Sequence, residues 1–291
     1  MTTISTVKEM QQAARVARGE GKRLALVPTM GALHDGHLSL VQEARKHANH
    51  VTVSIYVNPT QFGPSEDFEE YPREIESDLK KLGEIGGVDA VFAPLAKEMY
   101  PHGQKNNVTW VTVDQLDQEL CGRYREGHFR GVTTVVSKLF HACMPHVGVF
   151  GLKDAQQFLI LRRMVQDLCM EVELVGVPTY REKDGLAASS RNVYLSDTHR
   201  HQAPIIYKAL QYVRTLIVQG ETDADVIRHQ LNTMISLNSE GVVQYAQVVD
   251  VDFIQPVTQI EPGQELLVAA AVYFENTRLI DNVFVQSPDT L

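Results

Sequence analysis

Two histidines, His34 and His37, stand in a glycine-containing turn that follows a short apolar run and precedes an amphipathic segment. The apolar run, residues 24–27, predicts a buried strand, and apolar residues recur at helical spacing over 38–48. The N–H groups that open a helix attract anions, and two imidazoles three positions apart can face the same phosphate. Residues 28–37 therefore predict a nucleotide site, although a tight turn with two surface histidines has the same local composition.

Four other segments combine glycine with polar or charged residues where a loop at the end of a strand is expected. They are residues 58–64, 121–132, 150–157 and 181–192. Gln61 can donate and accept hydrogen bonds at a small polar substrate, and Lys153 can reach a phosphate from the start of a helix. The arginines of 121–132 suit a polyphosphate or a carboxylate, and the two serines and arginine within 181–192 can close over the phosphates of ATP.

Each of these segments also has a purely structural interpretation. Residues 58–64 contain the proline and glycine of an ordinary turn, and the charges of 121–132 are typical of a solvated loop. Asp154 would cap a helix whether or not a ligand binds, and a hinge needs small polar residues such as those of 181–192. The prediction of a site therefore rests on the five segments together.

Composition sets the class of protein and excludes some partners. The chain has 291 residues, of which 44% are hydrophobic and 22% charged, as in an ordinary globular protein with room for two modest domains. Its net charge of -9 argues against a broad nucleic-acid surface. An anionic ligand must therefore be held by local groups.

Cysteine usage and hydropathy predict a cytoplasmic protein. The three cysteines, Cys121, Cys143 and Cys169, form no C-x-x-C pair and fit a reducing compartment. The first twenty residues are polar and of helical character, and no apolar signal region follows them. The longest apolar stretch, residues 266–274, is too short to span a bilayer, so no membrane partner is expected.

Strand and helix signals alternate through the first 178 residues. The expected strands are residues 24–27, 51–57, 90–93, 147–150 and 172–177. The clearest helices have apolar faces within 132–143 and 155–168. Such alternation predicts βαβ units and a doubly wound parallel sheet, with ligands at the carboxyl ends of its strands. We therefore predict an α/β fold with a Rossmann-like nucleotide-binding domain in residues 1–178.

After residue 178 the pattern changes, which predicts a smaller α+β lid domain in residues 179–291. The polar loop 181–192 is followed by helical stretches near 201–218 and 223–237. Strands are expected at 244–253, 265–273 and 278–285, with a turn at 275–277.

Taken together, the five segments resemble the pantoate-beta-alanine ligase (pantothenate synthetase) family from about residue 28 to residue 195. The motifs stand in the family's order and spacing: residues 28–37, 61–64 with 71–73, 127–132, 153–154 with 157, and 189–192. That family belongs to the nucleotidyl-transferring superfamily, which shares the His-x-Gly-His signature with class I aminoacyl-tRNA synthetases. The departures are mild, because Leu152 and Ala188 occupy variable places within their motifs.

The resemblance implies ATP-dependent ligation of (R)-pantoate and beta-alanine to pantothenate, through a pantoyl-adenylate intermediate, with release of AMP and pyrophosphate. No covalent enzyme adduct is required. Mg²⁺ would accompany the phosphates, and no protein ligand of the metal is assigned. The implied partners are the three small-molecule substrates and a second copy of the chain in a homodimer.

The resemblance also implies roles for individual residues. The implied catalytic residues are His34, His37, Lys153, Ser189, Ser190 and Arg191, with His37 as the family's usual proton donor. The implied ATP-binding residues are Met30, Gly31, Ala32, Leu33, His34, Asp35, Gly36, His37, Gly151, Leu152, Lys153, Asp154, Tyr180, Ala188, Ser189, Ser190 and Arg191. Gln61 and Gln157 would bind pantoate, and Gln61 would also face beta-alanine.

Two alternatives stay open at this point. One is a nucleotidyltransferase that stops at a nucleotide adduct, such as a pantetheine-phosphate or nicotinamide-mononucleotide adenylyltransferase, although such folds need little beyond the nucleotide domain. The other is a non-catalytic nucleotide-binding or metal-storage module on His34, His37, His47 and His50, whose spacings lack a closed tetrahedral set. Release of AMP, measured with pantoate and beta-alanine omitted in turn, separates all three.

Overall fold

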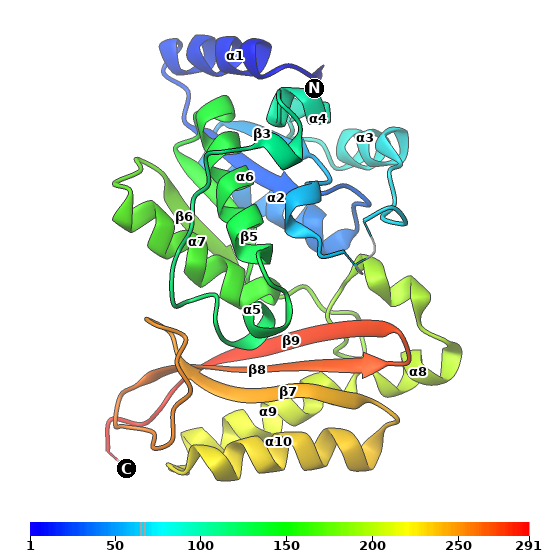
Figure 1. Cartoon of the computed structure of the whole chain (residues 1–291), viewed down its shortest axis with the longest axis vertical. Helices are drawn as coiled ribbons and strands as arrows, with labels where there is room; N and C mark the ends of the chain where they lie inside the picture. Colours follow the sequence, from blue (N-terminus) through cyan, green and yellow to red (C-terminus); the bar gives the residue numbers. More distant parts are fainter. Residues whose placement is uncertain (65, 67, 291) are drawn as a thin grey trace. The chain divides into compact units, whose positions relative to one another are not determined.

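The computed structural model describes residues 1–64, 66 and 68–290 and divides the chain into two compact units (Figure 1). Unit 1 comprises Met1–Asp114, Arg125–Leu152 and Ile160–Pro178. Unit 2 comprises Gln115–Tyr124, Lys153–Leu159 and Thr179–Leu291. Two segments that precede residue 178 thus group with the C-terminal part of the chain, because they contact its sheet.

Unit 1 is built on a six-stranded sheet in the order β1-β4-β3-β2-β5-β6, in which every pairing is parallel. The strands are β1 (Thr2–Ile4), β2 (Leu24–Thr29), β3 (His50–Ile55), β4 (Ala90–Phe92), β5 (Val147–Gly151) and β6 (Glu173–Val177). The predicted doubly wound α/β fold is confirmed, with the strand order reversing between β2 and β5. Strand β1 was not expected, because three residues at a sheet edge are too few to show a period.

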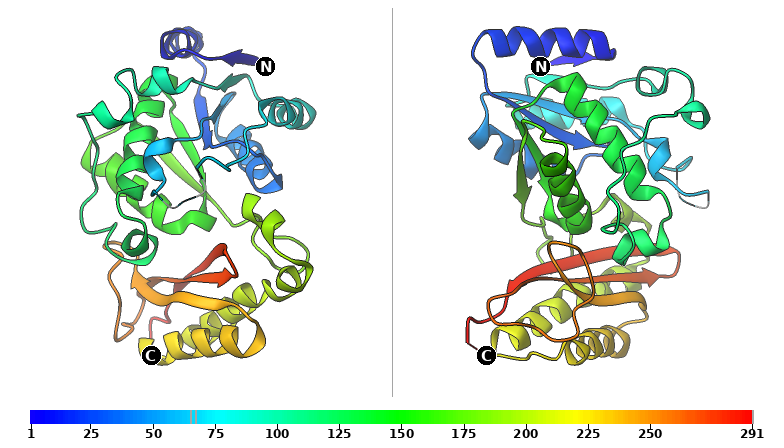
Figure 2. Two further views of the ribbon diagram at one scale, coloured as in Figure 1. Left: turned by 45° about the vertical axis from the view of Figure 1, so that its right-hand side comes forward. Right: turned by 60° about the vertical axis from the view of Figure 1, so that its left-hand side comes forward.

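Helices lie on both faces of this sheet (Figure 2). On one face, α2 (Asp35–His47) and α3 (Ile75–Ile85) pack onto the strands, with Val41, Ala44 and Leu82 in the shared core. On the other face, α1 (Val7–Gly19) contacts the mostly buried α6 (His128–Cys143). The other elements of unit 1 are α4 (Ala96–Met99), η1 (Pro59–Gln61) and η2 (Gln104–Asn106). Two further elements, η3 (Leu152–Asp154) and α7 (Ala155–Asp167), are divided between the two units.

Unit 2 contains an antiparallel sheet in the order β7-β8-β9, covered on one face by helices. The elements are α5 (Leu120–Tyr124), η4 (Ser190–Tyr194), α8 (Asp197–Gln202), α9 (Ile205–Val218), α10 (Ala224–Asn238), β7 (Val242–Asp250), β8 (Glu265–Phe274) and β9 (Thr277–Gln286). The predicted helical stretch 201–218 is two helices, because Pro204 stands at the start of α9 and cannot donate a backbone hydrogen bond to continue α8.

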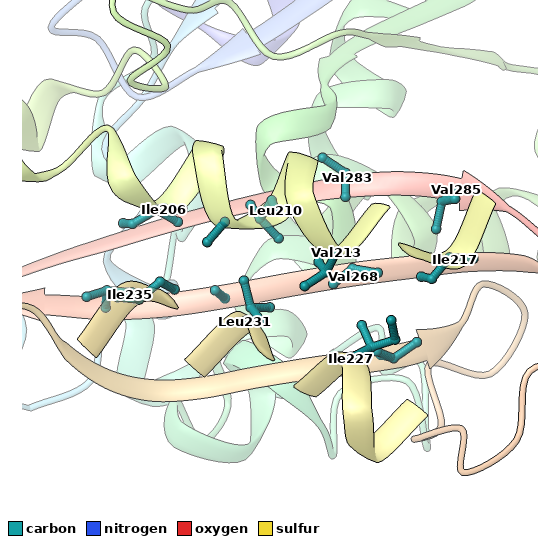
Figure 3. Packing of buried hydrophobic residues seen from close by; sticks show 14 of the residues in the cluster. Ile206, Leu210, Val213, Ile217, Ile227, Leu231, Ile235, Val268, Val283 and Val285 are labelled. Carbon is teal, nitrogen blue, oxygen red and sulfur yellow. The ribbon is translucent and has the colours of Figure 1, made fainter. Parts of the chain in front are cut away.

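Buried aliphatic side chains hold the helices of unit 2 on the sheet (Figure 3). Leu210 and Val213 of α9 and Leu231 of α10 face Val268 and Val283 of the strands, and all five are at most 9% exposed. In β9, Val283 alternates with Asn282, so Asn282 points to the opposite face of the sheet.

Candidate active site

The two histidines of the His-x-Gly-His motif lie at the N-terminus of α2, directly after the loop that leaves β2. The backbone N–H of Gly36 donates to Nδ1 of His34 (3.2 Å), and the backbone N–H of His34 donates to Nδ1 of His37 (3.3 Å). The ring centroids are 4.1 Å apart. Because each Nδ1 accepts a hydrogen bond, each neutral ring carries its proton on Nε2.

The loop between β2 and α2 is held by residues that sequence reasoning did not single out. Gly31 and Ala32 have φ angles of +85° and +49°, which turn the chain sharply. The N–H of Leu33 donates to Asp78 (2.8 Å), and Lys81 donates to the carbonyl of the same Leu33 (2.6 Å). Asp78 and Lys81 stand three positions apart on α3, so one helix clamps both polar groups of one residue.

Gln61 lies in η1, four residues after Val57, where the strand was expected to end, and its side-chain amide has a defined orientation. Asn58 donates to Oε1 of Gln61 (3.1 Å), and Nε2 of Gln61 approaches the sulfur of Met30 (3.2 Å). Asn58 is itself held by the hydroxyl of Tyr100 (2.8 Å) and is 1% exposed. Gln61, which is predicted to bind pantoate, thus contacts Met30 of the predicted nucleotide-binding loop within unit 1.

The arginines of 121–132 have partners within the protein. Arg125 makes two hydrogen bonds to Glu66 (2.6 and 2.7 Å) and donates to Nε2 of His128 (3.0 Å). His128 therefore donates from Nδ1 to the carbonyl of Gln61 (2.7 Å). Burial opposes the charge of Glu66, but the hydrogen bonds and charge of Arg125 outweigh it and hold the pKa of that carboxyl below its ordinary value.

The other two arginines are engaged as well. Arg123 lies 3.7 Å from a carboxylate oxygen of Glu119, and Arg130 stacks over the ring of Trp110 at 4.7 Å. Each of the three arginines thus has a partner within the protein, as the structural interpretation of this segment expects. Arg125 and His128 also connect the segment to η1 through the carbonyl of Gln61. Gly131 fits the same interpretation, because a Cβ at that position would lie 2.3 Å from the carbonyl oxygen of Thr60.

The chain passes from unit 1 to unit 2 just after β5 ends at Gly151. Gly151 and Leu152 belong to unit 1, whereas Lys153 and Asp154 belong to unit 2. The ammonium of Lys153 lies 3.7 Å from the carboxylate of Asp154, and the carbonyl of Lys153 accepts a hydrogen bond from Asn282 (2.8 Å). Gln157 is half-buried in the first turn of α7.

The Tyr180–Arg191 segment of unit 2 forms a small hairpin rather than an irregular hinge. The N–H of Ala188 donates to the carbonyl of Tyr180 (2.9 Å), and the hairpin turns at Gly185, whose φ is +98°. Ser189 accepts from the N–H of Arg191 (3.3 Å) and caps the short helix η4, in which Ser190 is the first residue. A defined backbone thus presents the two serines and Arg191.

Cys121 and Cys143 are buried and Cys169 is exposed, and burial raises the pKa of the Cys143 thiol well above its usual range. Across residues 1–64, 66 and 68–290, no group of three or more His, Cys, Asp or Glu side chains is placed to hold a metal ion. Within that same part of the chain, no helix has the length and apolarity needed to cross a membrane.

The family and its curated relatives match this chain over nearly its whole length. The family model of pantoate-beta-alanine ligase matches residues 2–284. The pantothenate synthetase of Salinibacter ruber is 54% identical, with 99% of each chain covered, and that of Acetivibrio thermocellus is 50% identical, with 98% of this chain and 100% of the relative covered.

Two solved structures extend the match to the fold. The pantothenate synthetase of Thermus thermophilus superposes with a TM-score of 0.87 at 43% identity, covering 97% of this chain and 99% of that one. The pantoate-beta-alanine ligase of Francisella tularensis, solved in complex with beta-gamma ATP and beta-alanine, gives a TM-score of 0.75 at 30% identity, with 97% of each chain covered. Sequence, fold and motif order agree, and the chain belongs to the pantoate-beta-alanine ligase family, as an enzyme of that family.

Proposed function

We propose that this enzyme joins (R)-pantoate to beta-alanine at the expense of ATP, through a pantoyl-adenylate intermediate, and releases AMP and pyrophosphate. Family membership and the ligands of the Francisella tularensis structure support the substrates. The observation that carries the proposal is the pairing of His34 and His37 at the N-terminus of α2.

The histidine pair suits a polyphosphate for two reasons. Both rings accept at Nδ1 and therefore offer Nε2–H as a hydrogen-bond donor. The 13-residue helix behind them adds the positive end of its dipole. A neutral His37 can release its Nε2 proton only as another arrives at Nδ1, so we assign it a hydrogen bond to the phosphate rather than transfer of a proton.

In the first step a carboxylate oxygen of pantoate attacks the α-phosphorus of ATP, the new O–P bond forms and pyrophosphate leaves. In the second step the amine of beta-alanine attacks the acyl carbon, AMP leaves, and the amine loses a proton. Positioning and neutralisation of phosphate charge supply the catalysis. We assign the neutralisation of phosphate charge to Lys153 and Arg191. Hydrogen bonds to the phosphates are assigned to His34, His37, Ser189 and Ser190.

ATP enters this scheme as its magnesium complex. Mg²⁺ characteristically keeps several waters and binds through substrate phosphates and one or two carboxylates. The backbone of residues 30–37, 151–154, 180 and 188–191 is assigned to the nucleotide.

Gln61 and Gln157 are assigned to pantoate, and Gln61 also to the incoming amine. Oε1 of Gln61 accepts a hydrogen bond from Asn58, so the amide is oriented to donate through Nε2. Nε2 lies 3.2 Å from the sulfur of Met30, and its second N–H suits a carboxylate or a hydroxyl oxygen. Removing one partner of a desolvated hydrogen bond costs about 1–3 kcal/mol, so Gln61→Ala or Gln157→Ala should weaken pantoate roughly ten- to a hundredfold and ATP within a few fold. Calorimetric titration with each ligand measures this directly.

A single experiment tests the reaction sequence. Enzyme, ATP, Mg²⁺ and pantoate are incubated without beta-alanine, and the mixture is searched by mass spectrometry for pantoyl adenylate. Omission of each substrate in turn shows which are needed for AMP release. AMP formed without pantoate, or pantothenate formed with no trace of the adenylate in quenched samples, would contradict the scheme. We further propose a cytoplasmic homodimer, whose dimeric state equilibrium sedimentation can test.

A further inference from the structure

Helices α9 and α10 cover one face of the unit 2 sheet (Figure 1). Side chains on the opposite face have partners in two earlier segments of unit 2. Tyr245 of β7 contacts the sulfur of Cys121 through its hydroxyl (3.2 Å), and its ring stacks on Tyr124. Arg278 of β9 lies 3.5 Å from the same sulfur. These contacts place α5 on the sheet, within unit 2.

The second segment on this face begins with Lys153. Nδ2 of Asn282 donates to the carbonyl oxygen of Lys153 at 2.8 Å, and Asn282 is 7% exposed. The backbone of Asn282 is in turn fixed, because Asn282 is paired with Ala269 of the central strand β8 and its backbone N–H donates to the carboxylate of Asp281 (2.8 Å). Asp281 is 4% exposed and makes a two-bond ion pair with Arg181 (2.6 and 2.9 Å).

Gln156 attaches the same segment at a second point. Its side chain is 5% exposed and donates to the carbonyls of Leu116 (2.9 Å) and Glu119 (2.8 Å), while Oε1 accepts from the N–H of Cys121 (2.9 Å). The peptide that carries Lys153 and the turn that carries Gln157 are therefore held to one sheet, directly by Asn282 and indirectly through α5.

We propose that Asn282 is a positioning residue for the reaction: its amide fixes the main chain of Lys153 and thereby the direction in which the ammonium reaches the phosphates. The proposal rests on the function assigned above to Lys153. Asn282 itself touches no reacting atom in this scheme. Removing the Asn282 side chain leaves the Lys153 carbonyl without that donor and allows the peptide to move. A displacement of about 1 Å at a catalytic group lowers the rate on the order of a hundredfold.

The test uses Asn282→Ala, Asn282→Asp and, as a matched control, Asn238→Asp. Asn238 makes the same kind of bond, from Nδ2 to the carbonyl of Met234 (2.8 Å), at the end of α10. Asn282→Ala should lower kcat roughly ten- to a hundredfold, with KM for pantoate unchanged within about threefold. Asn238→Asp should leave both constants within about twofold of the parent.

The Asn282→Asp variant distinguishes a lost hydrogen bond from a lost fold, because the activity of a single preparation is measured at two pH values. The introduced carboxylate cannot donate, but its protonated form can. Position 282 is buried and faces the carbonyl oxygen of Lys153, and both features favour the protonated form and raise the pKa of the introduced carboxyl. The ratio of variant to parent kcat should therefore rise at least about threefold between pH 8 and pH 5.5, with melting temperatures recorded at both values. A ratio that stays flat would overturn the proposal.

A double-mutant cycle with Lys153→Ala separates this inference from the proposed function. If Asn282 acts through Lys153, Asn282→Ala has little further effect on kcat once the lysine side chain is gone. A full additional loss in that background would show a general structural role and overturn the positioning proposal alone. Near-normal turnover of Lys153→Ala by itself would instead overturn the assigned role of Lys153, and the inference with it.

Discussion

The packing of η1 on α6 leaves no room for a side chain at position 131. An ideal Cβ there would lie 2.3 Å from the carbonyl oxygen of Thr60 and 2.8 Å from the backbone nitrogen of Gln61. The carbonyl of Gly131 also accepts a hydrogen bond from Asn58 (3.2 Å), which holds the Gln61 amide. Gly131→Ala should therefore displace the residue that we assign to pantoate.

The size of the effect follows from these distances. Ordinary van der Waals contact needs a separation of about 3.4 Å, so η1 must retreat by roughly 1 Å. Overpacking costs typically 1–3 kcal/mol, whereas alanine in place of glycine within a helix returns up to about 1 kcal/mol. We expect a net loss of stability of about 0–3 kcal/mol, together with a loss in kcat/KM for pantoate on the order of a hundredfold from the displaced amide.

The assay is initial-rate kinetics with pantoate and ATP varied separately, alongside thermal unfolding. Gly83→Ala is the matched control, because Gly83 also lies within a helix of unit 1 and a Cβ there meets nothing within 4 Å. The control should keep full activity and gain up to about 1 kcal/mol of stability. If Gly131→Ala binds pantoate and turns over like the control, the close approach of η1 to α6 does not position Gln61.

Three further outcomes are expected. Lys81→Met removes the donor to the Leu33 carbonyl and should weaken ATP by about three- to tenfold, with pantoate affinity unaltered in the same titrations. Because Arg125 depresses the folded-state pKa of Glu66, this pair stabilises the protein at neutral pH and its contribution disappears as the pH falls through that pKa; thermal unfolding of Glu66→Gln should show a smaller acid-induced loss than the parent. Cys169→Ser should retain turnover within about twofold, since Cys169 is exposed and the mechanism has no thiol step, and a large loss would bring that mechanism into question.

The fold was predictable wherever a hydrophobic period ran for several residues. Strands β2, β5 and β9 and helices α6 and α10 all lie within a few residues of their predicted positions. Buried βαβ units and an amphipathic hairpin can be recognised from the spacing of apolar residues within a short stretch of sequence. The exceptions, the three-residue β1 and the break before α9, depend on a sheet partner or on one proline, and neither changes the average pattern much.

The sequence predicts which segments form the candidate site, but it does not predict the hydrogen bonds and ion pairs that hold their side chains. His34, Gln61 and Lys153 were named from residue type and position alone, and their assignment to ligands stays a prediction. The basic stretch shows the difficulty, because an arginine that binds a phosphate and one that binds Glu66 look the same in the sequence. Which of the two occurs is decided by a carboxylate 59 positions away.

The partners that hold the predicted residues in place come from distant parts of the chain for a physical reason. A residue that must be placed accurately needs a second group that is itself immobile, and a polar side chain is held most firmly where it is buried in a helix or strand. Asp78 reaches Leu33 across 45 positions, and Asn282 reaches Lys153 across 129. No local pattern marks such residues, because Asp78 reads as a charged position in an amphipathic helix and Asn282 as a polar interruption in a strand. The structure shows that Asp281 and Asn282 of β9 are buried, and this burial, which the sequence does not display, distinguishes them from ordinary polar positions.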